Sequence, residues 1–427
     1  MRIRLPYGEG FLEAELPKHA RVIYSRTPSG VPKERADRLV EEALNRPVGS
    51  PRLEDLARGA GSVAILVTDR TRATPLELLL RGVVPRLRKA GVPRSGIRIV
   101  VATGLHTPHT PGEIRRLIGG FADEYEALSH DAEDRGSLRY LGTTRFGTPV
   151  EVNRLVVEAD LVVGLGLLEP HFFAGYSGGR KLILPGVAGA ASIYRNHSYS
   201  MLSHPRADYG VLDGNPVHED MVEAARMVRG YRFAVHTILD REKRVVEVVA
   251  GDPYESHRVG VEILDRYVKI PAPGGSDVVV VTNGGYPLDR DLYQGVKGIV
   301  TGSRIARRGG VVILVAECRD GVGHEGFREL MAMGRSPRDI LEYIRANEPI
   351  RDQWEAQKLA QVLLRNRVVV VTKGVDHGIL EEMKLTPASS LEEAMEIACR
   401  ETGCRRIAVV PEGPYVIPEP MNRSARS

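Results

Sequence analysis

The chain has 427 residues, of which 42% are hydrophobic and 27% charged, and its formal net charge is +4. This length exceeds the usual ceiling for one hydrophobic core, so we expect two domains. The ordinary balance of apolar and charged residues excludes a disordered protein, and the small, interspersed charge excludes a nucleic-acid-binding surface.

Short runs of β-branched residues recur along the chain, with stretches of helical pattern between them. Continuous apolar runs of this length are typical of strands covered on both faces, as in parallel sheets between layers of helices. We therefore predict an α/β fold with two domains, each with a mostly parallel sheet flanked by helices and with the active site in the cleft between them. In chain order, the predicted strands are Ser62–Thr68, Ile97–Thr103, Asp160–Gly166, Arg232–Leu239, Asp277–Thr282, Gly310–Ala316, Arg367–Thr372 and Arg406–Val410.

Two helix starts and one linker stand out between these strands. The run Thr110–Glu113 combines a capping hydroxyl, a proline in the first turn and a glutamate three residues on, and Ser389–Glu392 has the same capping-box spacing. Residues 271–276, PAPGGS, are rich in proline and glycine and precede a new strand, which is typical of a linker. The predicted domains are therefore residues 1–270 and 271–427.

The cysteines and the N-terminus bear on the compartment. Cys318, Cys399 and Cys404 form no CxxC pair, and so sparse and odd a set predicts neither a disulfide framework nor a zinc site. The first residues, MRIRLPYGEG, lack the apolar core of a signal peptide, and the apolar runs are much shorter than the roughly 20 residues of a membrane helix. We expect a cytoplasmic protein with no membrane or nucleic-acid partner.

Polar residues follow two of the strands in the first half of the chain. Ligands of open α/β sheets bind beyond the carboxyl ends of the strands. Asp69 to Arg72 come directly after SVAILVT, where they are either a helix-capping turn or a site for an anionic ligand. His106 follows IRIVVAT, between a strand end and a capped helix, where it is either a structural residue or a catalytic candidate.

The third polar strand end is the richest, reading GLGLLEPHFFAGYSGGRKLILPG over residues 164–186. Its glycines allow a backbone to approach a ligand closely. Lys181 lies between a flexible turn and an apolar run, so we expect a partly desolvated amine that can act as a nucleophile. The spacing differs from a Walker A loop, because Leu182 stands where a magnesium-binding serine or threonine would be. A glycine-rich turn with a solvated lysine is the alternative.

Further candidates lie beyond this segment. His197 belongs to no HExxH or other paired spacing, so local side chains alone do not predict a metal site, whereas one histidine together with cofactor atoms could hold a metal. Tyr293 and Lys297 are four residues apart on a predicted helix and share a face, as a plain surface pair also would. On this evidence alone the only tryptophan, Trp354, is a packing residue.

As an ordered set, these segments resemble the nickel-dependent lactate racemase family. The matching pieces are the Asp69-x-Thr71-Arg72 turn, ATGLHTP at residues 102–108, HFFAGYSGGRK at residues 171–181 with His197 after it, and Tyr293-Gln294-x-x-Lys297. HFFAGYSGGRK is the most specific of them. The set extends from residue 69 to Trp354 and so covers most of the chain.

The resemblance implies a cofactor and its attachment. The family carries a nickel-pincer nucleotide, pyridinium-3,5-bisthiocarboxylic acid mononucleotide. By resemblance, Lys181 is its covalent attachment point, His197 is the nickel ligand, and His106 and His171 are the catalytic acid/base pair. The resemblance further implies cofactor contacts from Asp69, Arg70, Thr71, Arg72, Ser177, Gly178 and Gly179, and substrate contacts from Arg72, Tyr293, Gln294, Lys297 and Trp354.

The implied activity is racemisation or epimerisation of a small 2-hydroxy acid, with lactate as the default, by hydride transfer to and from the cofactor. Two histidines can serve the two enantiomers from opposite sides, and cofactor-biosynthesis enzymes would be transient partners. On this scheme residues 1–270 bind the cofactor and residues 271–427 complete the substrate site. Two alternatives stay open: a pyridoxal-phosphate racemase with Lys181 as the Schiff base, and a non-enzymatic carrier that holds the nickel cofactor through Lys181 and His197.

Overall fold

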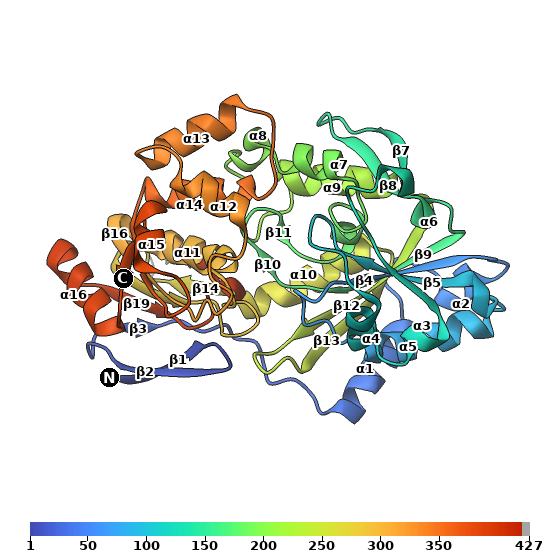
Figure 1. The fold of residues 1–427 in the computed structure, drawn as a ribbon. Coiled ribbons are helices and arrows are strands. Elements are labelled where there is room, and N and C mark those ends of the chain that lie inside the picture. The colour runs from blue at the N-terminus through green and yellow to red at the C-terminus, as the bar shows by residue number, and fades with distance from the viewer. Residues whose placement is uncertain (421–427) are drawn as a thin grey trace. The chain divides into compact units, whose positions relative to one another are not determined.

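The chain folds into two α/β units in a computed structural model that describes residues 1–420 (Figure 1). Unit 1 comprises Met1–Arg26 and Tyr267–Ser427, and unit 2 comprises Thr27–Arg266. Each unit has a six-stranded, mostly parallel sheet with helices packed against it, which confirms the predicted fold class. Among the described residues, no helix combines the length and apolarity that a membrane-spanning segment requires.

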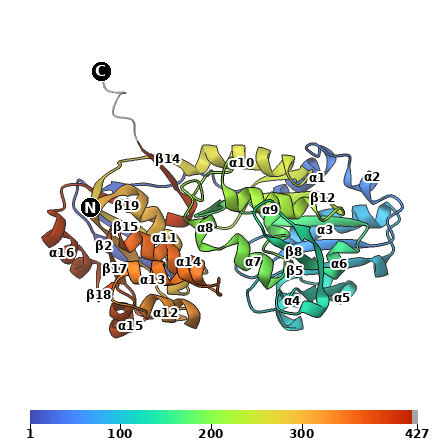
Figure 2. The ribbon, with the colours of Figure 1, turned by 90° about the horizontal axis from the view of Figure 1, so that it is seen from above.

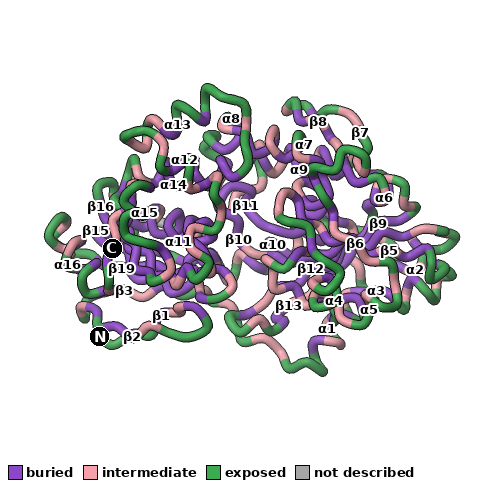
Figure 3. The backbone as a smooth tube through the Cα atoms, in the orientation of Figure 1, coloured by how far each residue is buried: buried purple, intermediate pink, exposed green. Residues whose placement is uncertain are grey.

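Unit 2 is built on a sheet with the strand order β13-β12-β9-β4-β5-β6. All neighbouring strands are parallel except β12 and β13, which form an antiparallel pair at one edge. The central strands are buried along their length, as Figure 3 shows in purple, because they are covered on both faces. The strands are β4 (Val63–Thr68), β5 (Ile97–Ala102), β6 (Glu126–Ser129), β9 (Leu161–Leu167), β12 (Tyr231–Leu239) and β13 (Val245–Gly251).

The first helices of unit 2 pack on one face of this sheet, where their leucines and valines join those of β4, β5 and β9 in a single core. Figure 2 shows α1, α2 and α3 grouped together in this unit. Two small hairpins, β7–β8 (Leu138–Thr143, Pro149–Asn153) and β10–β11 (Pro170–His171, Gly175–Tyr176), lie outside the sheet. The helices are α1 (Lys33–Asn45), α2 (Leu53–Ala57), α3 (Leu76–Lys89), α4 (Pro111–Ile118), α5 (Phe121–Glu124), α6 (Arg154–Val157), α7 (Ala190–Asn196), α8 (Tyr199–Leu202), α9 (Pro216–Arg226) and α10 (Glu255–Val268), with 3-10 turns η1 (Arg94–Gly96), η2 (Arg135–Ser137) and η3 (Gly179–Leu182).

The strand order of unit 2 reverses between β4 and β9. From β4 the chain proceeds outward through β5 to β6, and it then returns to place β9 on the other side of β4. The loops that leave β4 and β9 therefore separate in opposite directions and open a crevice above the carboxyl ends of these strands. Such a switch point is where open α/β sheets bind ligands.

Unit 1 holds a second sheet, with the order β18-β17-β16-β15-β19-β3 and every neighbouring pair parallel. A β1–β2 hairpin and α16 share a core with one face of the sheet, and α11 packs on β15 and β16. The strands are β1 (Arg2–Tyr7), β2 (Gly10–Glu15), β3 (Arg21–Val22), β14 (Lys269–Ala272), β15 (Ser276–Thr282), β16 (Ala306–Val315), β17 (Arg367–Val371), β18 (Thr386–Ala388), β19 (Ile407–Val410) and β20 (Ile417–Pro420). The helices are α11 (Leu292–Ile305), α12 (Glu325–Ala332), α13 (Pro337–Ala346), α14 (Gln353–Leu363), α15 (His377–Glu382) and α16 (Leu391–Thr402), with the 3-10 turn η4 (Gly413–Tyr415).

The division of the chain differs from the expected pair of contiguous domains in its first 26 residues. β3 pairs in parallel with β19, with Arg21 opposite Ala408, so the N-terminal segment completes the sheet of the C-terminal unit. The other boundary lies between Arg266 and Tyr267, close to the expected 270. The expected linker, residues 271–276, is partly strand β14, which pairs with β20.

The predicted positions of the strands are confirmed, whereas some predicted ends of strands and helices differ from the structure by one to four residues. All eight predicted strands are present, although β16 begins at Ala306 rather than Gly310. Thr110 and Glu113 form the predicted capping box of α4, whereas the cap of α16 lies one residue later than predicted, at Ser390, which accepts from the Glu393 amide. Cys399 and Cys404 are joined by a disulfide, which the sparse cysteines did not predict.

Candidate active site

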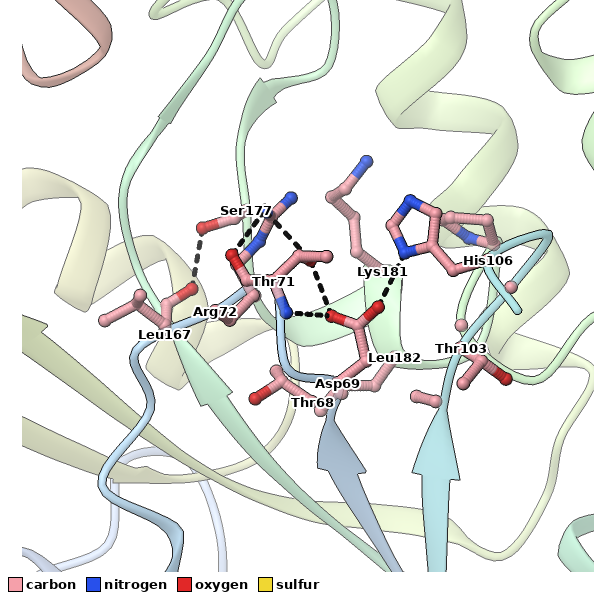
Figure 4. Close-up of a pocket in the computed structure, with 15 residues that line it drawn as sticks. Thr68, Asp69, Thr71, Arg72, Thr103, His106, Leu167, Ser177, Lys181 and Leu182 are labelled. Carbon is pink, nitrogen blue, oxygen red and sulfur yellow. Dashed lines mark hydrogen bonds and ion pairs between the residues drawn. The ribbon is translucent and has the colours of Figure 1, made fainter. Parts of the chain in front are cut away.

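A pocket lies at the switch point of unit 2, between the loops that follow β4, β5 and β9 (Figure 4). Its outline encloses about 550 Å³ that no protein atom fills, and this space includes open solvent, so a ligand can enter from outside. Polar and charged side chains line it together with the backbone of the glycine-rich turn. The lining side chains discussed below are Asp69, Thr71, Arg72, His106, Ser177 and Lys181.

The buried carboxylate of Asp69 pairs with the partly exposed imidazole of His106 across the β4 and β5 loops. Oδ2 of Asp69 lies 2.6 Å from Nδ1 of His106, and Oδ1 accepts from the backbone amide and hydroxyl of Thr71. Burial alone would raise the pKa of Asp69, but the neighbouring charges and hydrogen bonds of His106, Thr71 and Arg72 outweigh it and lower the pKa. An ionised carboxylate only accepts, so Nδ1 of His106 carries the proton and Nε2 is the nitrogen available for acid/base chemistry.

The two arginines of the β4 loop differ in their surroundings. Arg72 lines the pocket, with its Nε 3.2 Å from Oε1 of Glu169 and both side chains mostly buried. Arg70 instead forms a 2.5 Å ion pair with Glu113 of α4 and is not among the residues that line the pocket. The structure thus brings Asp69, Thr71 and Arg72 together at the pocket, and it places the Arg70 side chain outside it.

The glycine-rich turn forms another wall of the pocket. Gly178 has φ +78° and ψ −179°, a conformation that is essentially restricted to glycine, and a Cβ there would lie 2.9 Å from Cδ2 of Leu168. The Ser177 hydroxyl donates to the carbonyl of Leu167 and accepts from the amide of Glu169, so it fixes the turn to the end of β9. Gly178 and Ser177 line the pocket, whereas Gly179 does not.

Arg180 is a fixed cation beneath this turn that the sequence analysis did not single out. It is 1% exposed and donates to the carbonyl oxygens of Ala174, Ser177 and Gly178. Its Nη1 also lies 2.8 Å from Nε2 of His257. Because three carbonyl groups of the turn accept from one guanidinium, Arg180 fixes the conformation of the turn. The sequence did not indicate this burial, since an arginine beside a lysine is usually exposed to solvent.

Phe173 brings together three of the predicted residues. Its ring stands edge-on to those of His171 and His197, with centroids 4.5 and 5.1 Å away, and Nζ of Lys181 lies 5.7 Å from its centroid. Lys181 points into the pocket beside His106 in Figure 4, whereas His171 and His197 do not line this pocket. The aromatic pair Phe172-Phe173 gave no clear indication of this role in the sequence.

His197 follows α7 and is 5% exposed. Burial, with a smaller contribution from the charge of Lys181, lowers its pKa to about 3. The imidazole is therefore neutral near pH 7, which is the form that binds metal ions. Among residues 1–420, no group of three or more His, Cys, Asp and Glu side chains could hold a metal, so a metal at His197 would need ligands from a bound molecule.

The remaining predicted residues belong to unit 1 and lie on or next to its helices. Tyr293, Gln294 and Lys297 lie on α11, where Nζ of Lys297 donates to Oε1 of Gln294 at 2.6 Å. Trp354, on α14, is 8% exposed, and its Nε1 donates to the hydroxyl of Tyr293 at 2.8 Å. These four residues therefore form two linked pairs in one part of unit 1. Their part in substrate binding stays a prediction.

Comparison with known proteins finds lactate racemases that match nearly the whole chain. Residues 7–210 match the family model of the lactate racemase N-terminal domain, and residues 272–417 match that of the lactate racemase C-terminal domain. The lactate racemases of Thermoanaerobacterium thermosaccharolyticum and Lactiplantibacillus plantarum are each 36% identical to this chain over 97% of its length, and 98% and 99% of their own lengths are covered.

Solved structures agree with these matches. The structure of the lactate racemase apoprotein from T. thermosaccharolyticum superimposes with a TM-score of 0.93 and 36% identity, covering 98% of this chain and all of that one. A Thermotoga maritima protein of known crystal structure shares the fold, with a TM-score of 0.69 and 16% identity over 91% of this chain.

Proposed function

This chain belongs to the lactate racemase family and is an isomerase, and we propose that it racemises a small 2-hydroxy acid, with lactate as the default substrate. The observation that carries the proposal is the Asp69–His106 pair, which shares one pocket with Lys181 at the switch point of unit 2. A carboxylate that orients an imidazole is the arrangement used by general bases in enzymes. We further propose that the protein acts in the cytoplasm and meets cofactor-assembly enzymes transiently.

His106 serves as the base for the hydroxyl of one enantiomer. Asp69 fixes the tautomer, so Nε2 accepts the hydroxyl proton, and the carboxylate then stabilises the imidazolium that forms. His171 serves the other enantiomer. Its ring packs against those of both Phe172 and Phe173, with centroids 5.2 and 4.5 Å away, which restricts its orientation. Inversion at C2 requires proton transfer on either side of a planar keto acid, and two histidines meet that need.

Cations hold the substrate carboxylate. Arg72 lines the pocket and pairs with Glu169, so its guanidinium is oriented before substrate binds and still has further N–H groups to donate. Lys297 and Gln294 of unit 1 are coupled by a hydrogen bond and are the further proposed carboxylate contacts. Tyr293 and Trp354 of unit 1 are proposed to form a wall against the substrate, and their hydrogen bond fixes the two side chains relative to each other.

The residues present fit a nickel-pincer nucleotide attached to Lys181. Lys181 shares its solvent-open pocket with Arg72 and with the backbone of Gly178, and His197 is a buried neutral imidazole of the kind that binds nickel. Lys181 would hold the group covalently, His197 would bind its nickel, and Thr71, Arg72 and the turn at Ser177 and Gly178 would contact it. When bound, the group supplies an acceptor that takes the C2 hydrogen as a hydride and returns it.

The test is to produce the chain together with cofactor-assembly enzymes. We expect interconversion of D- and L-lactate, nickel in the protein, and added mass on the peptide that contains Lys181. Lys181→Ala should lose the added mass and the activity, whereas Lys89→Ala, at the exposed end of α3, should keep both. Full activity with an unmodified Lys181, or a visible internal-aldimine band without nickel, would contradict the proposal.

A further inference from the structure

A second carboxylate–imidazole pair lies in unit 1, formed by two residues that the sequence analysis did not single out. His324 immediately precedes α12, and Asp352 immediately precedes α14. Nδ1 of His324 lies 3.0 Å from Oδ2 of Asp352. The Asp352 side chain is 7% exposed, and that of His324 is 33% exposed. Asp352 is therefore buried behind the imidazole, which leaves the other edge of the ring, with Nε2, as the edge that a ligand can reach.

The His324 ring is held on the proposed substrate wall. It stacks on the ring of Tyr293, with centroids 4.1 Å apart and an interplanar angle of 7°. Phe327 packs edge-on against Tyr293 at 5.5 Å, and Trp354 donates to the Tyr293 hydroxyl. His324 is thus fixed both by its hydrogen bond to Asp352 and by an aromatic stack that favours a cation.

The backbone at Asp352 supports this arrangement. Asp352 has φ +67°, in the left-handed region that few residues other than glycine adopt. Backbone conformations of this kind are found mainly where the surrounding structure holds them. Here the conformation accompanies the side-chain contact with His324.

The charges around His324 favour its protonated form. Burial alone would lower its pKa, and Arg351 acts in the same direction, but the hydrogen bond and charge of Asp352 and the charge of Asp291 raise it overall. Asp291, which caps α11, lies within electrostatic reach of both His324 and Lys297, each of which lowers its pKa against the larger effect of burial. His324 therefore shares its surroundings with the proposed carboxylate contact Lys297.

We propose that His324 is a further substrate-binding residue, which holds the carboxylate of the 2-hydroxy acid in its imidazolium form beside Lys297. The inference rests on the proposed function, since it takes the unit 1 wall as the substrate wall. A charge-assisted N–H···O bond from Nε2 forms only while the ring is protonated. Substrate binding is then strongest at low pH and weakens as the pH rises through the pKa of His324, which Asp352 keeps high.

The only tryptophan of the chain, Trp354, reports on this wall because it contacts Tyr293 directly. L-lactate would be titrated into the cofactor-loaded enzyme at a series of pH values between about 5 and 9, with Trp354 fluorescence as the readout and lactate-free samples as blanks, and KM and kcat would be measured alongside. We expect His324→Gln to weaken binding about tenfold below the pKa of His324 and to remove this pH dependence. His377→Gln, an exposed histidine at the start of α15, should bind as the wild type does.

Asp352→Asn removes the charge that favours the imidazolium but keeps a side chain that can hydrogen-bond to His324 and to Tyr293, which Asp352 also contacts. Asparagine adopts the left-handed conformation readily, so the backbone is kept while the charge is lost. The pH at which binding weakens should then move lower, with kcat changed less than KM, which a purely structural role would not produce. Lactate binding that is independent of pH in the wild type, or unchanged in His324→Gln, would overturn the inference. Intact binding behaviour in an enzyme that does not racemise lactate would instead contradict only the proposed function.

Discussion

Replacing Asp69 with asparagine tests the proposed role of the Asp69–His106 pair most directly. The substitution keeps the shape of the side chain but removes its charge, and an amide can present either its oxygen or its NH₂ group to His106. In the native protein the carboxylate is buried, 4% exposed, and lies 2.6 Å from Nδ1 of His106. Its hydrogen bonds from Thr71 fix its orientation.

The size of the effect follows from Coulomb's law. With charge centres about 4 Å apart and an effective dielectric constant of about 20, the attraction between the carboxylate and an imidazolium is about 4 kcal/mol. Most of this attraction is gained only when His106 takes a proton from substrate. Its loss would therefore lower kcat by about a thousandfold, since each 1.4 kcal/mol is a factor of ten. The effect of losing a general base altogether is about 10²–10⁴-fold, which is of the same order.

The assay is the rate of lactate racemisation in both directions, expressed per molecule that carries the Lys181 adduct by intact mass. That correction matters because Asp69 also borders the pocket where the cofactor is proposed to bind. Glu113→Gln is the control: it disturbs the same loop through Arg70, without touching the pair. A fully loaded Asp69→Asn enzyme with wild-type kcat would refute the role of Asp69 as the group that stabilises His106.

The remaining predictions concern the other proposed roles. His171→Ala should lose about 10²–10⁴-fold in rate while keeping nickel, whereas His197→Ala should lose nickel; the reverse pattern in metal analysis would exchange the two roles. Lys297→Ala should raise KM without releasing the cofactor, as steady-state kinetics and intact mass would show. Gly178→Ala should destabilise the protein by about 1–3 kcal/mol in urea unfolding, and an unchanged midpoint would contradict the strained backbone there. Lactate deuterated at C2 should keep its label through racemisation in ordinary water, and rapid exchange with solvent would indicate proton abstraction instead. Because the folded protein lowers the pKa of Asp69, the ionised carboxylate contributes to the free energy of unfolding above about pH 4. This contribution is lost as the pH falls towards the pKa of Asp69 in the folded state. The free energies of unfolding of wild type and Asp69→Asn should therefore converge in acid titrations.

The parts of the fold that the sequence predicted are those with strong local patterns. The eight strands are continuous apolar runs because both faces of each sheet are covered, and such runs stand out without any knowledge of neighbours. The capping box at Thr110 is equally local. By contrast β3 has only two residues, Arg21 and Val22, and its place beside β19 depends on a partner nearly 390 residues away in the chain.

The residues of the site likewise fall into those that local patterns predict and those that depend on distant contacts. Asp69, His106 and Lys181 were found because they follow recognisable strands, and the carboxyl ends of neighbouring parallel strands meet at one edge. Their mutual geometry, such as the hydrogen bond between Asp69 and His106, could not be predicted from positions 37 residues apart. His324 and Asp352 were missed entirely, because each lies in a loop that begins a helix and neither follows a strand pattern.

The pairing of β3 with β19 has a consequence for how the chain is made. Unit 2 is an insertion within unit 1, entered after Arg26 and left before Tyr267, and the amide of Arg26 donates to the carbonyl of Tyr267 where the two crossings meet. During synthesis, unit 2 can therefore fold once residue 266 has emerged, whereas β3 must wait for its partner β19, around residue 407. An exposed edge strand is prone to pairing with other chains, so the ribosome-bound intermediate carries its aggregation hazard at the N-terminus. Chains that stop before Ile407 should accordingly keep a folded unit 2, but leave β3 without the strand that it pairs with.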